Sequence, residues 1–329
     1  MNSAPTAPRI SVVIVSYNTR DILRQCLLRL ADVAEGLVLQ TLVVDNASCD
    51  GSADMVAQEF PQIELIRSAS NLGFAAANNL AFERARAELV LLLNPDALLS
   101  PGSLRRACDH LDAHPRLAMG GARLVGRDGR AEPSGRQFPS LLNEALVLSG
   151  LAARYPQSRW LGRFDRSWDA SGRCVPVDWV PGAFALIRRQ VLQQLGGFDE
   201  RFFLYYEEVD LCRRLQQAGW QVWYWPDIEV HHSGGESSRT VAGAAFSKSG
   251  SQLTLWRMRS GLLYYRKQHG WLTARAVRAL EAGWHRLRAR RAIAQGQAEK
   301  AAESQRIVQL LAQAWRETDG GRIIPPRPW

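Results

Sequence analysis

Short apolar runs alternate with helical patterns along the first part of the chain. The runs are rich in β-branched and leucine side chains and end abruptly at polar residues, as strands buried on both faces of a sheet do. Four of them predict strands at 10–16, 37–44, 63–67 and 89–93. Helical spacing between them gives the order β-α-β-α-β-α-β, which predicts an α/β fold built on a doubly wound, mostly parallel sheet.

The pattern loosens after a helix expected at 101–114 and a strand expected at 117–125. Residues 134–174 look irregular, and a long insertion in a compact domain is a candidate cover for a binding site. Later elements are expected at the following positions: a helix at 202–218, extended segments at 221–225 and 228–232, and helices from about 249 to 318.

The distribution of charge adds a second feature. The 329 residues are 46% hydrophobic, so the chain is globular. Its formal charge is +9, yet residues 257–291 hold ten Arg or Lys against Glu281 alone. Five aromatic residues are interleaved with these cations: Trp256, Tyr264, Tyr265, Trp271 and Trp284. Such a segment fits an anionic membrane surface or a nucleic acid, and the alternative is a solvated helical face.

The cysteines and the N-terminus bear on the compartment. Five cysteines without a close pair argue against a disulfide framework or a zinc site and favour a reducing compartment. The first ten residues show no secretory signal, and no window approaches the roughly 18 apolar residues that span a bilayer. We expect a cytoplasmic protein, soluble or peripheral to the membrane.

A carboxylate follows the strand at 89–93, in the sequence Asn94-Pro95-Asp96. Pro95 fixes its own φ and keeps Asn94 out of the helical region, so this turn is stiff. Ligands of open α/β sheets bind beyond the carboxyl ends of strands, and a hard oxygen ligand there suits Mg²⁺ or Mn²⁺. The alternative is a plain turn into a helix capped at Ser100.

Glu207, Glu208 and Asp210 head an amphipathic helix. The helix dipole favours acidic residues there, and Asp210 can pair with Arg214 one turn on. Alternatively, one carboxylate is a general base whose pKa is raised by the aromatic run at 202–206. The sequence leaves both interpretations open.

Two other polar strand ends are candidates. His231 and His232 close an extended segment, and because strand side chains alternate, at most one of them faces a ligand at the sheet edge. A histidine at a strand end is more often hydrogen-bonded than metal-bound. Asp45 either caps the turn after the second strand or accepts a hydrogen from a ligand.

Several enzyme classes lack their motifs in this chain. No G-x-G-x-x-G follows the first strand, and neither G-x-x-x-x-G-K-[ST] nor G-x-S-x-G occurs. These absences argue against a dinucleotide-binding dehydrogenase, a P-loop NTPase and an α/β-hydrolase.

Taken together, these pieces resemble the inverting family 2 glycosyltransferases of the GT-A fold, in particular the bacterial rhamnosyltransferase-like branch. The matching stretches run in family order over about residues 10–240: SVVIVSYNTRDIL, VVDNASCDGS, NLGFAAANN, LLLNPDALL, GAFALIRR, GGFDERFFLYYEEVDLCRRL and HHSGGESS. Co-ordered motifs of this length are far more specific than any one of them. The resemblance implies a GT-A domain at 1–245, with a nucleotide-sugar half at about 10–125 and an acceptor and catalytic half at about 126–245, and a basic helical extension at 246–329.

Carried over residue by residue, the resemblance assigns Tyr17, Asn18 and Asp45 to the nucleotide base, with Asp45 accepting from the pyrimidine N3–H. It implies three further residues near the nucleotide and diphosphate: Asn71, Gly73 and Asn78.

The family's D-x-D motif corresponds to Asn94-Pro95-Asp96, which implies that Asp96 holds Mg²⁺ or Mn²⁺ on the diphosphate. Asn94 stands in place of the first Asp of that motif and carries no charge. The roles left for Asn94 are contact with the ribose or contact with the metal through a water molecule. His232 matches the histidine before x-G-G-x-S and implies metal or diphosphate binding.

The catalytic group implied by the resemblance comprises Glu207, Glu208 and Asp210. Glu208 is the base by position, although Glu207-Glu208 stands where the family usually has Glu-Asp, so Glu207 stays a rival. The base takes a proton from an acceptor hydroxyl, which displaces the nucleoside diphosphate with inversion.

The rhamnosyltransferase branch implies dTDP-L-rhamnose as the donor and a glycan on a polyprenyl diphosphate as the acceptor, in cell-surface polysaccharide assembly. UDP- or GDP-linked sugars stay open. Attraction of about 1 kcal/mol per Lys or Arg would hold the basic segment on the inner face of the cell membrane.

Two other classes remain as alternatives. A sugar nucleotidyltransferase should carry a Gly-rich basic loop after the first strand, where this chain has Tyr17-Asn18-Thr19. A nucleic-acid-binding protein would use the basic segment and show salt-sensitive binding. We expect no nucleic-acid partner.

Overall fold

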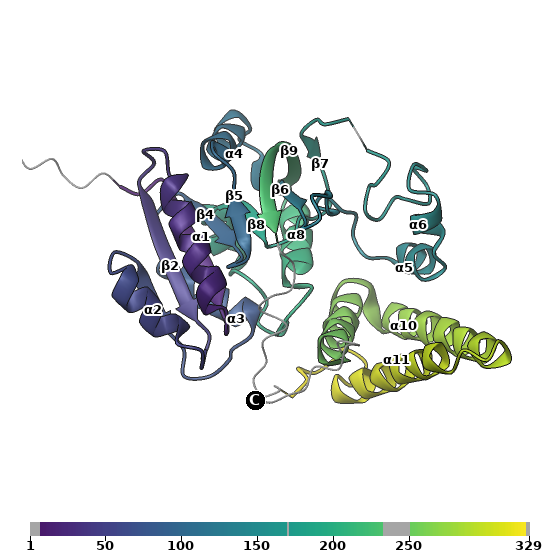
Figure 1. Cartoon of the computed structure of the whole chain (residues 1–329). Helices are drawn as coiled ribbons and strands as arrows, with labels where there is room; N and C mark the ends of the chain where they lie inside the picture. The colour runs from purple at the N-terminus through teal and green to yellow at the C-terminus, as the bar shows by residue number, and fades with distance from the viewer. Residues whose placement is uncertain (1–6, 170, 233–250, 327–329) are drawn as a thin grey trace, which may run out of the picture. The chain divides into compact units, whose positions relative to one another are not determined.

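The structure, a computed structural model, describes residues 7–169, 171–232 and 251–326 (Figure 1). The chain divides into two compact units. The first comprises Met1–Gln137, Asp169–Asp199 and Glu208–Ala242, and the second comprises Phe138–Trp168, Glu200–Glu207 and Gly243–Trp329. The stretch that follows His232 in the HHSGGESS motif lies outside the described residues.

The four expected strands form the first part of the sheet. They are β1 (Ile10–Ser16), β2 (Leu39–Asp45), β3 (Glu64–Arg67) and β4 (Leu89–Leu93). They pair in parallel in the order β3-β2-β1-β4. The apolar runs of β1, β4 and most of β2 are buried on both faces, as the sequence predicted, whereas in the edge strand β3 only Ile66 is buried.

The helices of this part lie close to their expected places. They are α1 (Arg20–Asp32), α2 (Ser52–Glu59), α3 (Phe74–Phe82) and α4 (Ser103–Ala113). The expected cap of α4 at Ser100 was wrong, because Gly102 takes the N-cap position in the left-handed conformation. A three-residue strand before it, β5 (Ala97–Leu99), is too short to be predicted from the sequence pattern.

The rest of the sheet is mixed. It contains β6 (Leu117–Val125), β7 (Val175–Pro176), β8 (Phe184–Arg188) and β9 (Gln221–His232). β8 is antiparallel to both β4 and β6, β9 is parallel to β6, and β5 and β7 are antiparallel to β9. The two extended segments expected at 221–225 and 228–232 are therefore one strand.

Two helices, α7 (Arg189–Leu195) and α8 (Glu207–Gln217), follow β8 in the chain. The expected helix at 202–218 began too early. Tyr205 and Tyr206 both have φ of 70°, and a helix cannot run through left-handed residues. α8 therefore starts at Glu207.

The second unit is helical. It contains α5 (Leu141–Leu148), α6 (Leu151–Arg154), α10 (Ser251–Ala294) and α11 (Ala298–Glu317). α5 and α6 lie in the stretch expected to be irregular. α10 is broken at Gly270, where φ is 83° and ψ is 172°. No helix in the described ranges combines the length and the apolar character that crossing a bilayer requires.

The core of the second unit uses several aromatic residues of the basic segment. Trp256, Tyr264 and Tyr265 are 2%, 0% and 1% exposed. The interpretation of all five aromatics as an outward-facing set was therefore wrong for these three. Trp271 is 42% exposed, and Trp284 is half-buried. A helical period cannot by itself distinguish a core face from a membrane-facing one.

Glycine is required in β6, where the fully buried Trp225 ring crosses the strand. A Cβ atom on Gly120 would overlap that indole ring. The ring is 0% exposed and packs in the core of the first unit, so it has no free space to move into.

We therefore expect Gly120→Ala to lower the free energy of unfolding of the first unit by about 1–3 kcal/mol through overpacking. Gly182→Ala is the matched control, because its new methyl group would lie 3.5 Å from Phe74, an ordinary contact distance. Denaturant titration of both variants provides the measurement. An equal effect in the two variants would contradict this role of Gly120.

Candidate functional site

The strand register gathers the polar strand ends at one edge of the sheet. Ser16 pairs with Asp45 at the carboxyl ends of β1 and β2. Leu93, at the end of β4, pairs with Phe184 at the start of β8, because these strands are antiparallel. Since β6 is antiparallel to β8 and β9 is parallel to β6, the carboxyl ends of β6 and β9 lie at that same edge.

Asp45 supplies a buried carboxylate after β2. It is 4% exposed, and its Oδ2 accepts a hydrogen bond of 3.1 Å from the Ser48 backbone N–H. The other oxygen, Oδ1, is buried and has no hydrogen-bond partner among the described residues. The capping role that the sequence allowed is thus confirmed for one oxygen, and the second can accept a hydrogen from a ligand.

Asn18 lies opposite this turn. Its backbone N–H donates to Ser48 Oγ at 3.0 Å, and its side-chain Oδ1 accepts from the Cys49 N–H at 2.8 Å. Asn18 has φ of 52°, a left-handed conformation that Asn tolerates. Tyr17, which precedes it, is half-buried. The turns after β1 and β2 are therefore joined.

A side-chain network stiffens the neighbouring loop. Asn46 Nδ2 donates to Asn71 Oδ1 at 2.9 Å, and Asn71 Oδ1 also accepts from the Gly73 N–H at 2.9 Å. Asn46 Oδ1 accepts from the Leu72 N–H. Asn78 is 1% exposed and donates to the Phe74 carbonyl. The side chains of Asn71 and Asn78 thus hold backbone in place at this edge.

Asp96 and His232 face each other across β5 and β9, because Ala97 pairs with His232 in the ladder. Asp96 is 4% exposed, and its Oδ1 lies 3.4 Å from His232 Nε2. Glu132 Oε2 lies 3.3 Å from the other ring nitrogen, Nδ1. The sequence predicted Asp96 and His232 together, and the register brings them into contact. His231 is 57% exposed, as strand alternation requires.

The charges around His232 favour its cationic form. Burial lowers the pKa of His232, but the carboxylates of Asp96 and Glu132 outweigh burial and hold the pKa above its ordinary value.

Asn94, the other polar residue of the turn, is half-buried, and its backbone N–H donates to the Ala183 carbonyl at 3.1 Å. This bond ties the turn after β4 to the residue before β8. The side chain of Asn94 stays available at the same edge.

Glu208 lies in the first turn of α8 and is half-buried. Burial raises its pKa above the ordinary value, against the opposing effects of backbone N–H groups and the Arg136 guanidinium. Its Oε2 is buried and has no hydrogen-bond partner among the described residues. A carboxylate with a raised pKa and an oxygen without a hydrogen-bond partner is a candidate general base.

One short segment connects Glu208 with the Asp96–His232 pair. Glu132 contacts His232, and Arg136, four residues on, acts on Glu208. The segment is anchored beside β6, since the Glu132 N–H donates to the Leu124 carbonyl and Arg136 exchanges backbone bonds with Trp179. Sequence reasoning missed both Glu132 and Arg136, because this stretch has no periodic pattern.

The two remaining acidic candidates are more deeply buried than Glu208. Asp210 is 0% exposed, and its Oδ2 accepts from Arg214 Nε at 2.8 Å. Arg214 also donates to the carbonyls of Leu195 and Gly197. The expected pair of Asp210 and Arg214 is thus confirmed as a buried structural contact. Glu207 is 4% exposed at the start of α8.

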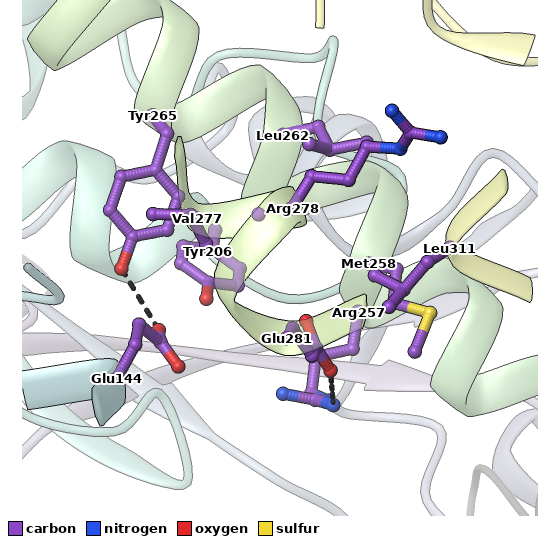
Figure 2. A pocket seen from close by; sticks show the side chains of 11 residues that line it. Glu144, Tyr206, Arg257, Met258, Leu262, Tyr265, Val277, Arg278, Glu281 and Leu311 are labelled. Carbon is purple, nitrogen blue, oxygen red and sulfur yellow. Dashed lines mark hydrogen bonds and ion pairs between the residues drawn. The ribbon is translucent and has the colours of Figure 1, made fainter. Parts of the chain in front are cut away.

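A separate polar cavity lies within the helical unit (Figure 2). Glu144 accepts from the Tyr265 hydroxyl at 2.9 Å, and Arg257 Nη2 lies 3.6 Å from Glu281 Oε1. Burial raises the pKa of both Glu144 and Glu281. Arg257, the first cation of the basic segment, thus faces this cavity although its side chain is 51% exposed.

The chain is similar in sequence to known glycosyltransferases. The model of glycosyl transferase family 2 matches residues 11–196. The chain is 33% identical over 255 residues to the N-acetylglucosaminyl-diphospho-decaprenol L-rhamnosyltransferase of Mycobacterium tuberculosis, covering 73% of this chain and 82% of that protein. It is 24% identical over 264 residues to rhamnosyltransferase WbbL of Escherichia coli, covering 78% and 92%.

The fold has solved relatives. A mannosyltransferase, PcManGT of Pyrobaculum calidifontis, was solved in complex with GDP-Man and Mn²⁺. It superposes with a TM-score of 0.54 at 16% identity, over 95% of this chain and 89% of that one. The expected GT-A fold is therefore confirmed. Because the family model matches more than half of the chain and the mycobacterial enzyme is similar over most of its length, the chain belongs to glycosyl transferase family 2 and is similar to its rhamnosyltransferases.

Proposed function

We propose that the protein is an inverting, metal-dependent hexosyltransferase. It moves L-rhamnose from dTDP-L-rhamnose to a glycan or polyprenyl-diphosphate-linked acceptor in cell-surface polysaccharide assembly. The proposal rests on the segment 132–136. Its Glu132 contacts His232 of the Asp96–His232 pair, and the charge of its Arg136 lowers the pKa of Glu208 against the effect of burial. Diphosphate-binding groups and a candidate base are thereby linked in one unit.

The part of the proposal that concerns the nucleotide of the donor rests on Asp45. A buried carboxylate oxygen without a partner is costly unless a ligand supplies a donor. The imide N3–H of thymine or uracil is such a donor, and the N1–H of guanine is another. The names of the two rhamnosyltransferase relatives favour rhamnose as the sugar.

Asp96 and His232 fit a divalent cation on the diphosphate. One carboxylate oxygen and one imidazole nitrogen face each other at 3.4 Å, and both side chains are largely buried. Mg²⁺ and Mn²⁺ accept such sparse protein ligation when phosphate oxygens and water complete the shell. When bound, the ion stabilises the charge that develops on the leaving diphosphate.

Glu208 is the base in this proposal. Its partnerless Oε2 accepts the proton of an acceptor hydroxyl as the oxygen attacks the anomeric carbon. The Arg136 guanidinium opposes the rise that burial causes in the pKa of Glu208. Asp210 orients α8 through Arg214, and so acts as a positioning residue.

The helical unit offers a surface for an anionic membrane. A groove along α10 and α11 is lined by Trp284, Leu287, Arg288, Arg291 and Lys300, among other residues. Leu272 and Ile293 are 74% and 60% exposed on α10. Exposed apolar side chains flanked by cations suit the interface of an anionic bilayer, which we place at the inner face of the cell membrane.

Replacement of the metal-binding carboxylate tests the donor site. We expect Asp96→Asn to lower sugar transfer by about a hundredfold or more. It should also abolish the rise in melting temperature that dTDP-L-rhamnose with Mn²⁺ produces. Asp54→Asn is the control, because Asp54 is 69% exposed on α2. The same melting-temperature assay with UDP- and GDP-linked sugars identifies the donor. Full activity of Asp96→Asn would contradict the proposed metal-binding role of Asp96.

Replacement of the base tests the chemistry separately from binding. We expect Glu208→Gln to lower kcat by about 10²–10⁴-fold while donor-induced stabilisation is kept. Glu207→Gln should retain most activity. The reverse pattern would transfer the role of base to Glu207.

The pH dependence has a definite sign. Glu208 must be ionised to act, and its folded pKa is raised, so kcat/KM should fall as pH drops through a value above the ordinary 4.5. For stability, the group's contribution is present below the unfolded pKa and lost as pH rises through the folded pKa. Glu208→Gln should therefore be at least as stable as the parent at neutral pH, which urea titration checks.

Charge reversal in the groove tests membrane binding. Arg291→Glu with Lys300→Glu should weaken binding to vesicles of anionic lipid by about thirtyfold, since each lost cation removes about 1 kcal/mol. Arg84→Glu with Arg86→Glu changes the net charge equally, at side chains 54% and 72% exposed on the first unit. Equal losses in a vesicle-sedimentation assay would argue against the groove.

A further inference from the structure

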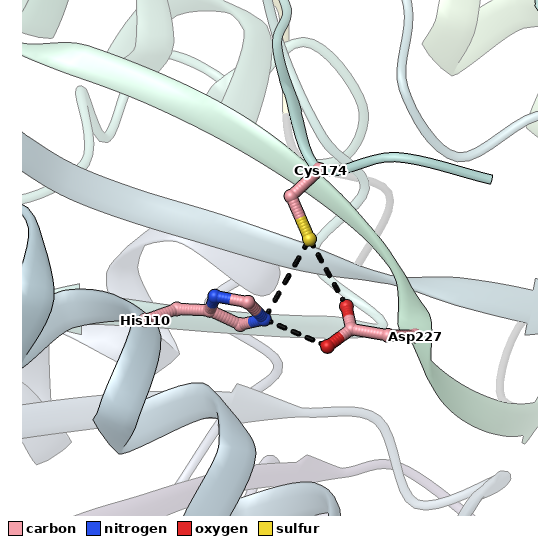
Figure 3. Close-up of side chains that lie close together, drawn as sticks. All are labelled: His110, Cys174 and Asp227. Carbon is pink, nitrogen blue, oxygen red and sulfur yellow. Dashed lines mark hydrogen bonds and ion pairs between the residues drawn. The ribbon is translucent and has the colours of Figure 1, made fainter. Parts of the chain in front are cut away.

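Three side chains with metal-binding atoms converge in the first unit, outside the site described above (Figure 3). His110 lies on α4, Cys174 lies immediately before β7, and Asp227 lies in β9. His110 Nε2 is 2.8 Å from Asp227 Oδ2 and 3.6 Å from Cys174 Sγ, which lies 3.1 Å from Asp227 Oδ1. Among the described residues, this is the one group of three such side chains whose ligand atoms all lie within 4.8 Å of one another.

The fold holds each member in place. The register between β6 and β9 jumps from Ala122 opposite Trp225 to Arg123 opposite Glu229, so three residues of β9 bulge out, Asp227 in the middle. Val175 pairs with Tyr224, which sets Cys174 beside the start of that bulge. The His110 ring stacks on Trp225 at 5.2 Å between centroids.

The distances between the candidate ligand atoms are close to those in a tetrahedral zinc centre. Bond lengths of about 2.3 Å to sulfur and about 2.0–2.1 Å to nitrogen and oxygen imply ligand separations of about 3.3–3.6 Å at tetrahedral angles. The separation of Cys174 Sγ and His110 Nε2 is already 3.6 Å. The two carboxylate distances, 2.8 Å from His110 Nε2 to Asp227 Oδ2 and 3.1 Å from Cys174 Sγ to Asp227 Oδ1, would each have to lengthen by about 0.5 Å around an ion.

We propose that His110, Cys174 and Asp227 bind one Zn²⁺ ion, with water in the fourth position. The thiolate, imidazole and carboxylate set is softer than the oxygen-rich sites that Mg²⁺ and Mn²⁺ prefer, so this centre selects a different metal from Asp96. Asp227 is 40% exposed, which leaves access for the ion and for water. The bound ion joins α4 and the residue before β7 to the bulge of β9, and so stabilises the first unit.

A nucleophilic cysteine is a poorer explanation of this cluster. In a catalytic Cys-His-Asp arrangement the carboxylate orients the ring through the nitrogen opposite the one that meets the sulfur. Here Cys174 and Asp227 both contact Nε2 of His110.

Metal analysis of the full-length chain tests the proposal. After treatment with chelator and dialysis against Zn²⁺, we expect one equivalent of zinc per chain and a higher melting temperature. Substitution with Co²⁺ should give a thiolate-to-cobalt charge-transfer band, which reports the sulfur ligand directly in the unaltered protein. Absence of both the zinc and the band would overturn the proposal.

Variants distinguish this centre from other metal sites. Cys174→Ser should abolish the cobalt band and lower zinc affinity at least tenfold, whereas Cys49→Ser, at an exposed cysteine, should change neither. Asp96→Asn should keep the zinc and the band, so failure of the glycosyltransferase proposal would not mimic failure here. If Cys174→Ser binds zinc like the parent, or if Asp96→Asn loses it, the assignment is wrong.

Discussion

The antiparallel insertion of β8 between β4 and β6 is the constraint on which the site depends. β8 runs antiparallel to both β4 and β6, so β4 and β6 point the same way and their carboxyl ends lie at the same edge of the sheet. The ends of β4, β6 and β9 are thereby collected at the edge where β1 and β2 also end. Backbone hydrogen bonds set this register, and a slip by one residue would turn each side chain to the opposite face.

The acidic side chains of the candidate site are held in different ways. Asp210 has a close cationic partner in Arg214, and Asp96 has His232. Asp45 and Glu208 each keep one buried oxygen without a hydrogen-bond partner among the described residues. Because such an oxygen lowers stability until a donor reaches it, the structure is consistent with a site whose polar groups are completed by ligands.

The helical unit divides its cations between structure and surface. Arg259 is 6% exposed and pairs with Glu317 at 2.5 Å. By contrast, Arg291 and Lys300 are exposed along the groove. The high net charge of this segment therefore overstates the charge available to an outside partner, since buried pairs neutralise part of it.

Hydrophobic periodicity alone determined the strands and helices of the first half of the sheet, because a run buried on both faces excludes most other structures. It also placed Asp45, Asp96 and His232 at strand ends. It could not show that Tyr205 and Tyr206 are left-handed, since that conformation is imposed by the surroundings. Nor could it find Glu132 and Arg136, which follow no repeating pattern, or join His110, Cys174 and Asp227, whose spacing in the chain resembles no metal motif. These partners meet through strand pairing and a bulge, and such contacts between distant residues are decided only when the sheet has formed.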